Sequence, residues 1–335
     1  EPKPKCRAHL WPYGEYRPLL LESGEQVSLD DAERRVLALV NPGMAGMMRA
    51  TDDLFCGLQL ILPGEVAWTH RHNITALRFI IEGSGGFTRV EGEKTYMEPG
   101  DLIVTRNWSW HDHGHEGDGP MIWMDGLDLP ITLALGTSFV ERGADAQSPE
   151  TAPAGFSSAQ FGANMRPVGH RSVEPVSPIL NYPYTAAREA LEAMRAGGEW
   201  DPWFGLKLEY TDPTTGGPAM PTMSTHMQLL PKGFTSERYQ TTDGAVYSVV
   251  GGQGRVIVGE GEDTVTLDWG PRDAFVIPHW QPHRFEAADD SFLFSFSDKA
   301  AQEKLGLWRE VRGNLIGMAL IPSDRAPVPS ANSTG

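Results

Sequence analysis

The chain has 335 residues, of which 40% are hydrophobic, and its formal net charge is −16 at pH 7. This length suggests two domains or one large one, and the apolar content is enough for packed cores. The negative charge argues against a nucleic-acid partner, because nucleic-acid binding needs a basic face. The sequence contains no run of about 18 apolar residues, so it predicts no membrane span. The two cysteines favour a reducing cytoplasm over a disulfide framework.

Short runs of Val, Ile, Leu, Phe and Thr alternate with 37 glycines and 26 prolines. This pattern is typical of many short strands joined by turns, as in a β-sandwich or β-barrel. In chain order, the first candidate helix is a short one over residues 30–37. A clearer helix is predicted over 186–195, with Thr185 as its cap and Gly197-Gly198 at its end.

Histidines are concentrated in one part of the chain: five of the ten lie between residues 70 and 115. His70 and His72 would share one face of a strand, because side chains alternate, and His111 could join them from a neighbouring strand. Three neutral imidazoles can hold a divalent metal and leave coordination positions open. Zinc fits such a set but is redox-inert, whereas Fe(II) suits oxygen chemistry. His115 is expected to be exposed, because it begins a polar, turn-rich loop.

The sequence repeats itself. Residues 58–114 and 227–285 follow the same order of strands, Leu-Pro, Gly-x-Gly turn, acidic turn and Trp-x-x-His. Two copies of one β-barrel are the direct interpretation. The second copy keeps only His283, while residues 238–241 stand near the positions of the first two histidines. The first barrel is therefore expected to bind the metal, and the second is expected to be structural.

The repeat predicts five segments. They are an N-terminal arm with a short helix (1–50), a catalytic barrel (51–150), a linker with a helix (151–205), a second, metal-less barrel (206–315) and a C-terminal tail (316–335). Chemistry is expected in the second of these segments, because it contains the whole histidine cluster.

His-x-His, a Pro-Gly-Asp turn and a distal histidine resemble the two-part motif of the cupin superfamily. The tandem arrangement is similar to the gentisate 1,2-dioxygenases, whose close relatives cleave salicylate and 1-hydroxy-2-naphthoate. The motifs that carry this resemblance include NPGMAG (41–46), HRHNITALRFIIEG (70–83), WHDHG (110–114), NYPY (181–184) and LFSFSD (293–298). The resemblance implies an all-β bicupin of two double-stranded β-helix (jelly-roll) barrels with a few helices. It also implies Fe(II), O2 as co-substrate and a homotetramer.

The resemblance also implies the reaction, which is opening of the gentisate ring between C1 and C2 to give maleylpyruvate. Many cupins add a glutamate ligand four residues after the second histidine, and here that position is Ala76. The metal then keeps more open positions, so that a substrate chelating through two oxygens can bind together with O2. Gentisate offers its carboxylate and its 2-hydroxyl, and a small aromatic hydroxy acid is the expected partner.

Three side chains are candidates for handling the substrate. Arg78 has the parity of His72, and a buried arginine needs an anion, either the substrate carboxylate or a structural partner. The resemblance suggests Arg34 as a second carboxylate contact, although a charged helix end is ordinarily solvated. His113 has the parity of His111 and could move a proton on the substrate, or it could lie at the rim.

Further candidates come from two other strands. Asp125 is similar to an active-site aspartate of the gentisate enzymes and could accept a hydrogen bond from the 5-hydroxyl, orient His113, or simply cap a turn. Phe55, Gly57 and Gln59 share parity on a strand where related enzymes contact substrate; Gly57 would leave room for the ring and Phe55 could stack on it. The aromatic residues expected to serve as barrel packing are Trp108, Trp110 and Trp123.

Two alternative functions remain open. The same chemistry could act on salicylate, a substituted gentisate or 1-hydroxy-2-naphthoate. A different class is a metal-binding cupin that is an isomerase, a sugar-binding module or a storage protein, and oxygen uptake would separate this class from a dioxygenase. A transcription regulator is disfavoured, because no helix-turn-helix pattern or basic segment is present.

Overall fold

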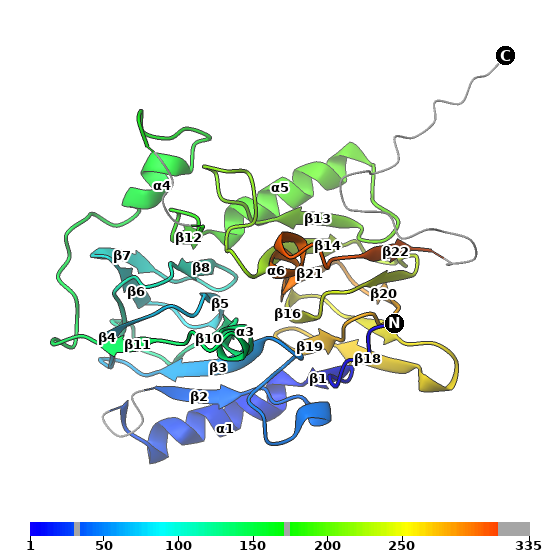
Figure 1. Cartoon of the computed structure of the whole chain (residues 1–335), viewed down its shortest axis with the longest axis horizontal. Helices are drawn as coiled ribbons and strands as arrows, with labels where there is room; N and C mark the ends of the chain where they lie inside the picture. Colours follow the sequence, from blue (N-terminus) through cyan, green and yellow to red (C-terminus); the bar gives the residue numbers. More distant parts are fainter. Residues whose placement is uncertain (30–33, 171–174, 314–335) are drawn as a thin grey trace.

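The computed structural model of the chain describes residues 1–29, 34–170 and 175–313. Its strands form two barrels that lie side by side, one from each half of the sequence (Figure 1). Each barrel consists of a six-stranded and a five-stranded sheet. The predicted all-β tandem cupin fold is confirmed.

The first barrel contains all five histidines of the cluster. Its six-stranded sheet has the order β12-β8-β5-β10-β3-β2, and its five-stranded sheet has the order β11-β4-β9-β6-β7. The strands of the larger sheet are β2 (Arg35–Ala38), β3 (Phe55–Ile61), β5 (Ala76–Glu82), β8 (Leu102–Thr105), β10 (Met121–Leu127) and β12 (Asn181–Tyr182). Those of the smaller sheet are β4 (Val66–His72), β6 (Gly86–Val90), β7 (Glu93–Tyr96), β9 (His111–His115) and β11 (Val140–Arg142).

The second barrel repeats this plan with the orders β1-β19-β16-β21-β14-β13 and β18-β17-β20-β15-β22. The strands of its larger sheet are β1 (His9–Trp11), β13 (Leu206–Glu209), β14 (Ser224–Leu230), β16 (Ala245–Gly251), β19 (Ala274–Ile277) and β21 (Ser291–Ser297). Those of its smaller sheet are β15 (Tyr239–Thr241), β17 (Gly254–Val258), β18 (Val265–Trp269), β20 (His283–Ala287) and β22 (Glu310–Arg312).

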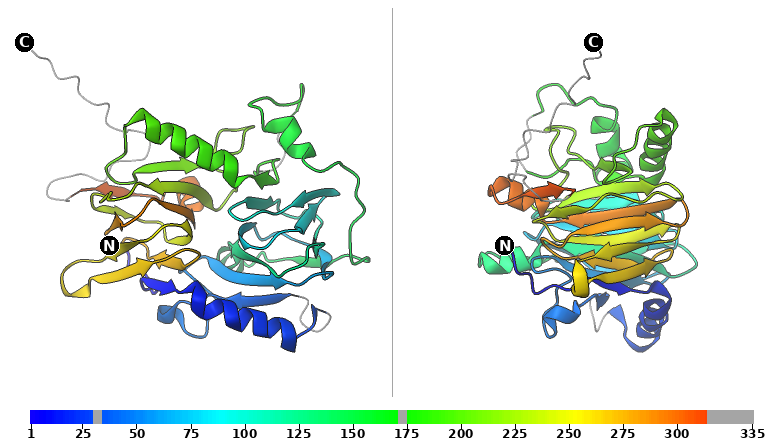
Figure 2. Two further views of the ribbon diagram at one scale, coloured as in Figure 1. Left: turned by 180° about the vertical axis from the view of Figure 1, so that it is seen from behind. Right: turned by 90° about the vertical axis from the view of Figure 1, so that its right-hand side faces the viewer.

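Helices are few and lie outside the barrels. They are α1 (Tyr13–Gln26), α3 (Leu129–Ala134), α4 (Phe156–Phe161), α5 (Tyr184–Gly197) and α6 (Lys299–Lys304), with short 3-10 turns η1 (Pro42–Met44) and η2 (Gly261–Asp263). α1 packs on β2 and β3, and α5 packs on β13 and β14, on opposite sides of the molecule (Figure 2). Among the described residues, no helix is long and apolar enough to cross a bilayer.

The helix predictions were partly right. α5 confirms the predicted helix, and Gly198 ends it in a left-handed conformation. Thr185 is not its cap, because the helix begins at Tyr184, two residues before the predicted start, and Pro183 precedes it. The predicted helix over 30–37 is wrong for residues 35–37, which lie in β2, while 30–33 are outside the described residues. α1 was missed, because Pro18 interrupts its pattern.

The two halves exchange their first strands. β1 pairs with β19 of the second barrel, and β12 pairs with β8 of the first. After each of these strands the chain passes through a proline into α1 or α5. The first amide of each helix donates to an aspartate in the other half: Tyr13 N to Asp273 Oδ1 over 2.8 Å, and Tyr184 N to Asp101 Oδ1 over 2.9 Å. These aspartates end the two Pro-x-Asp turns, which thus hold the exchanged segments in place.

The barrels also share a hydrophobic core. One cluster of buried residues runs from strands of the first barrel into strands of the second. At its centre Phe79 and Phe294 stack face to face, with ring centroids 4.0 Å apart. Gly126 of the first barrel leaves room for the Phe296 ring of the second, because a Cβ at Gly126 would lie 2.8 Å from that ring. The first barrel, which contains the histidine cluster, is therefore packed on one side against the second barrel.

Candidate metal centre

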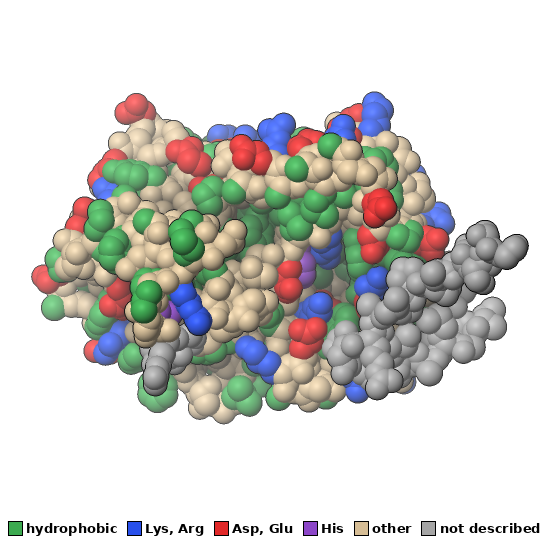
Figure 3. Space-filling view, turned by 90° about the horizontal axis from the view of Figure 1, so that it is seen from above, with side chains coloured by type: hydrophobic (Ala, Val, Ile, Leu, Met, Phe, Trp, Pro, Cys, Tyr) green, Lys and Arg blue, Asp and Glu red, His purple; other side chains and the backbone are tan. Residues whose placement is uncertain are grey.

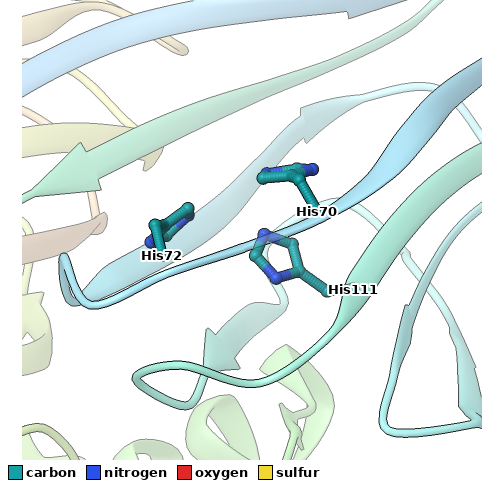
Figure 4. Close-up of side chains that lie close together, drawn as sticks. All are labelled: His70, His72 and His111. Atoms are coloured by element: carbon teal, nitrogen blue, oxygen red, sulfur yellow. The ribbon is translucent and has the colours of Figure 1, made fainter. Parts of the chain in front are cut away.

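Two neighbouring strands bring three imidazoles together in the first barrel. β4 contributes His70 and His72, β9 contributes His111, and the register places His70 opposite His111. A β-bulge after Ala67 breaks the ladder just before these residues, and bulges of this kind re-aim side chains. One ring nitrogen of each histidine lies within 4.8 Å of the other two, and the rings gather at one point in Figure 4. The group predicted from the sequence can therefore hold a metal ion.

Hydrogen bonds fix which ring nitrogen faces the centre. The Nδ1 atom of each of the three rings lies 2.8–2.9 Å from a backbone carbonyl oxygen two residues away in the chain. Nδ1 must therefore carry the proton, which leaves Nε2 as a free electron-pair donor. The Nε2 atoms of His70 and His111 are buried and have no hydrogen-bond partner. Buried polar atoms without partners are rare, and a metal ion would satisfy these two.

Burial keeps the three rings neutral. It lowers the pKa of His70 to about 3 and that of His72 to about 4, and it holds the pKa of His111 well below the usual range. Metal binding needs imidazoles without a proton on the donor nitrogen, so these side chains are ready for it at neutral pH. No carboxylate belongs to this group among the described residues, and Ala76 is buried at the position where many cupins have glutamate.

A buried arginine and a buried aspartate face each other next to the histidines. Arg78 on β5 is directly opposite Asp125 on β10, with 3.5 Å between Nε and Oδ1. Arg78 Nη1 also donates to Thr105 Oγ1 over 2.6 Å, and its Nε has no hydrogen-bond partner. Burial lowers the pKa of Arg78 to about 10, so that it stays charged at neutral pH. The guanidinium is thus held in place with one donor unused.

Asp125 has a second partner in Trp123, whose Nε1 donates to its Oδ1 over 3.1 Å. Burial raises the pKa of this carboxyl, although Arg78 and Arg34 act in the opposite direction. Asp125 does not orient His113, whose Nδ1 lies 2.9 Å from Thr88 Oγ1 instead. That alternative for Asp125 is therefore wrong.

His113 nevertheless lies beside the centre. Its ring centroid is 5.7 Å from that of His111 and 5.7 Å from that of Trp123. Its Nε2 is buried without a partner, and burial holds its pKa well below the usual range. It is not a rim histidine, because it is completely buried. A neutral imidazole with a free nitrogen is a suitable hydrogen-bond partner for a substrate.

Arg34 is half-buried and lies directly before β2. Its charge is close enough to lower the pKa of His70 and to oppose the raised pKa of Asp125. Burial lowers the pKa of Arg34 itself. Arg34 is therefore near the candidate site and is not a solvated residue at a helix end.

The three β3 candidates are all buried. The side-chain nitrogen of Gln59 has no hydrogen-bond partner, and Gln59 is paired in register with Trp123. A Cβ at Gly57 would lie 2.7 Å from Val36 Cγ1 and 3.0 Å from Phe55 Cζ. In this structure the glycine thus accommodates those two side chains, and Phe55 leans over it.

Sequence reasoning misplaced three residues and missed two others. His115 is buried, because the turn after β9 folds back and brings Gly119 O onto its Nε2. Trp108 and Trp110 do not pack inside the barrel; each ring lies 4.5 Å from the Arg71 guanidinium at the surface. Thr88 and Thr105, which orient His113 and Arg78, were missed. No alternation of buried and exposed residues marks them, because every residue of β6 and β8 is buried.

Comparisons with known proteins agree with this geometry. Residues 57–127 match the model of the Cupin domain family. The chain is 49% identical over 312 residues to gentisate 1,2 dioxygenase 1 of Aquipseudomonas alcaligenes, covering 93% of this chain and 89% of that one. The solved salicylate 1,2-dioxygenase from Pseudaminobacter salicylatoxidans superimposes with a TM-score of 0.86 at 32% identity, covering 93% and 90%. Its adduct with gentisate gives a TM-score of 0.87 at 31% identity, covering 93% and 86%.

Proposed function

The chain belongs to the gentisate 1,2-dioxygenase family of ring-cleaving dioxygenases, and on that premise we propose that it opens the gentisate ring between C1 and C2 to give maleylpyruvate. The observation that carries the proposal is the set of three buried, neutral imidazoles that meet at one point, two of which have a buried Nε2 without a partner. His70, His72 and His111 would hold Fe(II). Bound iron supplies the redox chemistry that lets O2 react with an aromatic ring, which protein side chains cannot provide.

Charge balance explains why an anionic substrate would enter. Among the described residues, the neutral histidines leave two guanidiniums, those of Arg78 and Arg34, near the carboxylate of Asp125. These three groups together carry one net positive charge even before a metal binds. A buried charge without a counter-ion is unfavourable, so this region favours an anionic ligand. The substrate carboxylate would fill that place, and Arg78 has an unused donor for it. Arginine suits carboxylates because its planar donors match their two oxygens.

The polar atoms around this arginine would fix the position of the ring. Asp125 is held by Trp123 and Arg78, and its remaining oxygen can accept a hydrogen bond from the 5-hydroxyl. Gln59 Nε2 and His113 Nε2 are further buried atoms without partners. Gln59 can donate to a substrate oxygen, and neutral His113 can accept a hydroxyl proton. Such positioning converts a collision between three components into a reaction within one complex.

Phe55 is the side chain on which substrate range would depend. It leans over Gly57 beside Val36, and Gly57 is directly opposite Asp125 in the pairing of β3 with β10. A ring that binds there must stack on Phe55 or move it, so larger acids would need a larger displacement. A 5-hydroxyl makes the substrate ring easier to oxidise, which favours gentisate over salicylate. The salicylate 1,2-dioxygenase that this chain resembles has also been solved as an adduct with gentisate.

Oxygen uptake by the iron-loaded protein tests the proposal. The full chain is reconstituted anaerobically with Fe(II), mixed with gentisate and then exposed to O2. We expect one O2 consumed per gentisate and the absorbance of a maleylpyruvate-type product. Salicylate and 1-hydroxy-2-naphthoate are run in parallel, and the zinc-loaded protein is the redox-inert control. No uptake with any of these acids would reject the dioxygenase assignment, and faster uptake with another acid would reject gentisate.

A further inference from the structure

Thr105 on β8 supports the arginine of the candidate site. Its register partner on β5 is Ala76, two residues before Arg78. Its hydroxyl oxygen accepts a hydrogen bond from Arg78 Nη1 over 2.6 Å. Both residues are buried, so little water competes for this bond. The bond therefore fixes the end of a long side chain that could otherwise adopt several rotamers.

The repeat shows that this threonine accompanies the arginine. Arg78 lies on β5, which pairs with β8, and its counterpart Tyr247 lies on β16, which pairs with β19. Thr105 and Ile277 are equivalent, because each is the register partner of the alanine two residues before Arg78 or Tyr247. Where the guanidinium is replaced by a phenol ring, the hydroxyl that holds it is therefore replaced by an apolar side chain.

Two further supports are lost in the same way. In each case a side chain of the first barrel that is hydrogen-bonded to a group at the candidate site has an apolar counterpart in the second barrel. The pairs and their counterparts are Thr88–His113 with Val256–Phe285, and Trp123–Asp125 with Leu293–Ser295. The second barrel folds to the same plan without these supports, which indicates that they serve the site rather than the barrel.

The second barrel also shows that the position of Thr105 faces the interior. That barrel contains a cavity of about 330 Å³, and both Ile277 and Tyr247 are in its wall. Viewed from the α5 side, the molecule has a hollow where acidic, basic and histidine side chains gather (Figure 3). Because Ile277 lines a cavity beside Tyr247, the equivalent Thr105 is placed to act on Arg78 at the interior of the first barrel.

The arginine and the aspartate of the first barrel form an open pair. Arg78 Nε is 3.5 Å from Asp125 Oδ1 and has no hydrogen-bond partner among the described residues. A charged hydrogen bond between such groups is ordinarily about 2.7–2.9 Å long and often bidentate. β5 lies between β8 and β10, so Thr105 and Asp125 are on opposite sides of Arg78. The bond to Thr105 thus draws the guanidinium away from the carboxylate.

We propose that Thr105 is a positioning residue, which holds Arg78 away from Asp125 so that the guanidinium stays available to the substrate carboxylate. A closed Arg78–Asp125 pair would satisfy both charges within the protein and leave fewer donors for a ligand. It would also engage the carboxylate that is needed for the substrate hydroxyl. The benefit to the substrate rests on the proposed function, whereas the open pair is a property of the protein alone.

Two variants separate the hydroxyl of Thr105 from the shape of its side chain. Thr105→Val removes the acceptor and keeps the branched shape, and Thr105→Ser keeps the acceptor. With Fe(II)-loaded protein and gentisate, we expect Thr105→Val to raise KM at least about tenfold with kcat within about threefold of the parent. Thr105→Ser should stay within about threefold of the parent in both constants. A parent-like KM in Thr105→Val, or the same rise in Thr105→Ser, would overturn the proposal.

The matched control is Thr225→Val in the second barrel. Thr225 is a buried threonine whose hydroxyl has no hydrogen-bond partner among the described residues, so this change should leave KM and kcat unchanged. A second comparison places Thr105→Val in an Arg78→Met background. There it should alter kcat/KM by less than about twofold, because no guanidinium remains to be positioned. A further tenfold loss would show that Thr105 acts through another group and would contradict the proposal.

Crystal structures of the metal-free parent and of Thr105→Val test the open pair without a ligand. We expect the distance from Arg78 Nε to Asp125 Oδ1 to shorten from 3.5 Å to about 2.9 Å in the variant. A guanidinium that does not move would overturn the proposal. Failure of the parent to consume O2 with gentisate would reject the proposed function and leave this structural result unaffected.

Discussion

The two barrels share one backbone plan but carry different interiors. The register gives these pairs of first-barrel and second-barrel residues: His70 and Tyr239, His111 and His283, Arg78 and Tyr247, Asp125 and Ser295. His72 lies two residues after His70 on β4, and Thr241 lies two residues after Tyr239 on β15, so His72 and Thr241 form a further equivalent pair. The strands, turns and exchanged edges are kept, while the inward side chains are replaced. The scaffold thus sets where a site is, and a handful of inward positions set its chemistry.

The difference extends to charge. Among the described residues, the interior of the first barrel places Arg78 and Arg34 near the one carboxylate of Asp125, beside neutral imidazoles. The cavity of the second barrel is lined by more carboxylates than cations: Glu209, Asp243, Glu303 and Glu310 against Lys207, Lys299 and Arg312. Matched substitutions at equivalent positions can therefore test whether the two interiors have separate roles.

The largest effect is expected at the position that is a histidine in both barrels, His111 in the first and His283 in the second. His111→Ala should remove iron and activity together, because two imidazoles hold Fe(II) far more weakly than three. His283→Ala should keep both, since Tyr239 and Thr241 stand where the other ligands would be. Iron per chain, measured by plasma mass spectrometry, and oxygen uptake check this pair. Loss of about half the iron in His283→Ala would show that the second barrel binds metal.

The next effect is expected at the arginine position. Arg78→Met should keep the iron but lower kcat/KM for gentisate by about 10²–10³-fold, the cost of losing a buried charge partner. Tyr247→Phe, at the equivalent position, should leave kcat/KM within about twofold. Steady-state oxygen uptake measures both. Parent-like kinetics in Arg78→Met would mean that its role is only structural.

A third test concerns His279 of the second barrel, which lies among three carboxylates. His279 Nε2 lies 3.3 Å from Asp53 Oδ1, across the barrel interface, and 3.6 Å from Asp298 Oδ2, while its Nδ1 lies 3.7 Å from Asp52 Oδ2. Burial alone would lower the pKa of His279. The hydrogen bonds to Asp298 and Asp53 outweigh burial and raise this pKa to about 11. The proton is bound more tightly in the folded state than in the unfolded state, where the pKa is about 6.5.

The stability contributed by His279 is therefore complete below about pH 6.5 and is lost as the pH rises towards 11. Between pH 7 and 9 the free energy of unfolding of the wild type should fall by up to about 1.4 kcal/mol per pH unit relative to His279→Gln. Urea unfolding at several pH values measures this. Parallel pH profiles of the two proteins would contradict a protonated His279.

The smallest effect is expected at the two exchanged helices. Asp101→Asn and Asp273→Asn each weaken a charged hydrogen-bond acceptor at the first turn of α5 or α1, which should cost about 1 kcal/mol of unfolding free energy. Similar losses from both variants are predicted by the symmetry of the exchange. A loss from only one of them would show that the two connections are not equivalent, and chemical denaturation measures both.

Side-chain alternation explains what the sequence could predict. It placed His70 with His72 on β4 and His113 with His111 on β9, because strand parity survives even next to a bulge. Arg78 was also predicted from the parity of His72, but the two residues lie on different strands, β4 and β5, so this agreement does not follow from alternation. The repeat predicted two barrels, and α5 was visible from its run of helix formers. These are local, periodic signals, and such signals can be found without knowing which strands are neighbours.

Long-range pairing could not be predicted in this way. β1 and β12 have three and two residues, too few to show a period, so their exchange between the barrels left no pattern. Thr88 became recognisable only when β6 was known to lie beside His113 on β9. Trp108 and Trp110 were misplaced because an aromatic residue near a metal motif suits packing and a surface contact with Arg71 equally well.

The most direct test of the central claim is an anomalous diffraction map at the iron edge, from crystals of the Fe(II)-loaded protein soaked anaerobically with gentisate. The account predicts one iron per chain, bound by the Nε2 atoms of His70, His72 and His111, with the gentisate carboxylate beside Arg78. Iron in the second barrel, or a protein carboxylate among the ligands in the first, would contradict it.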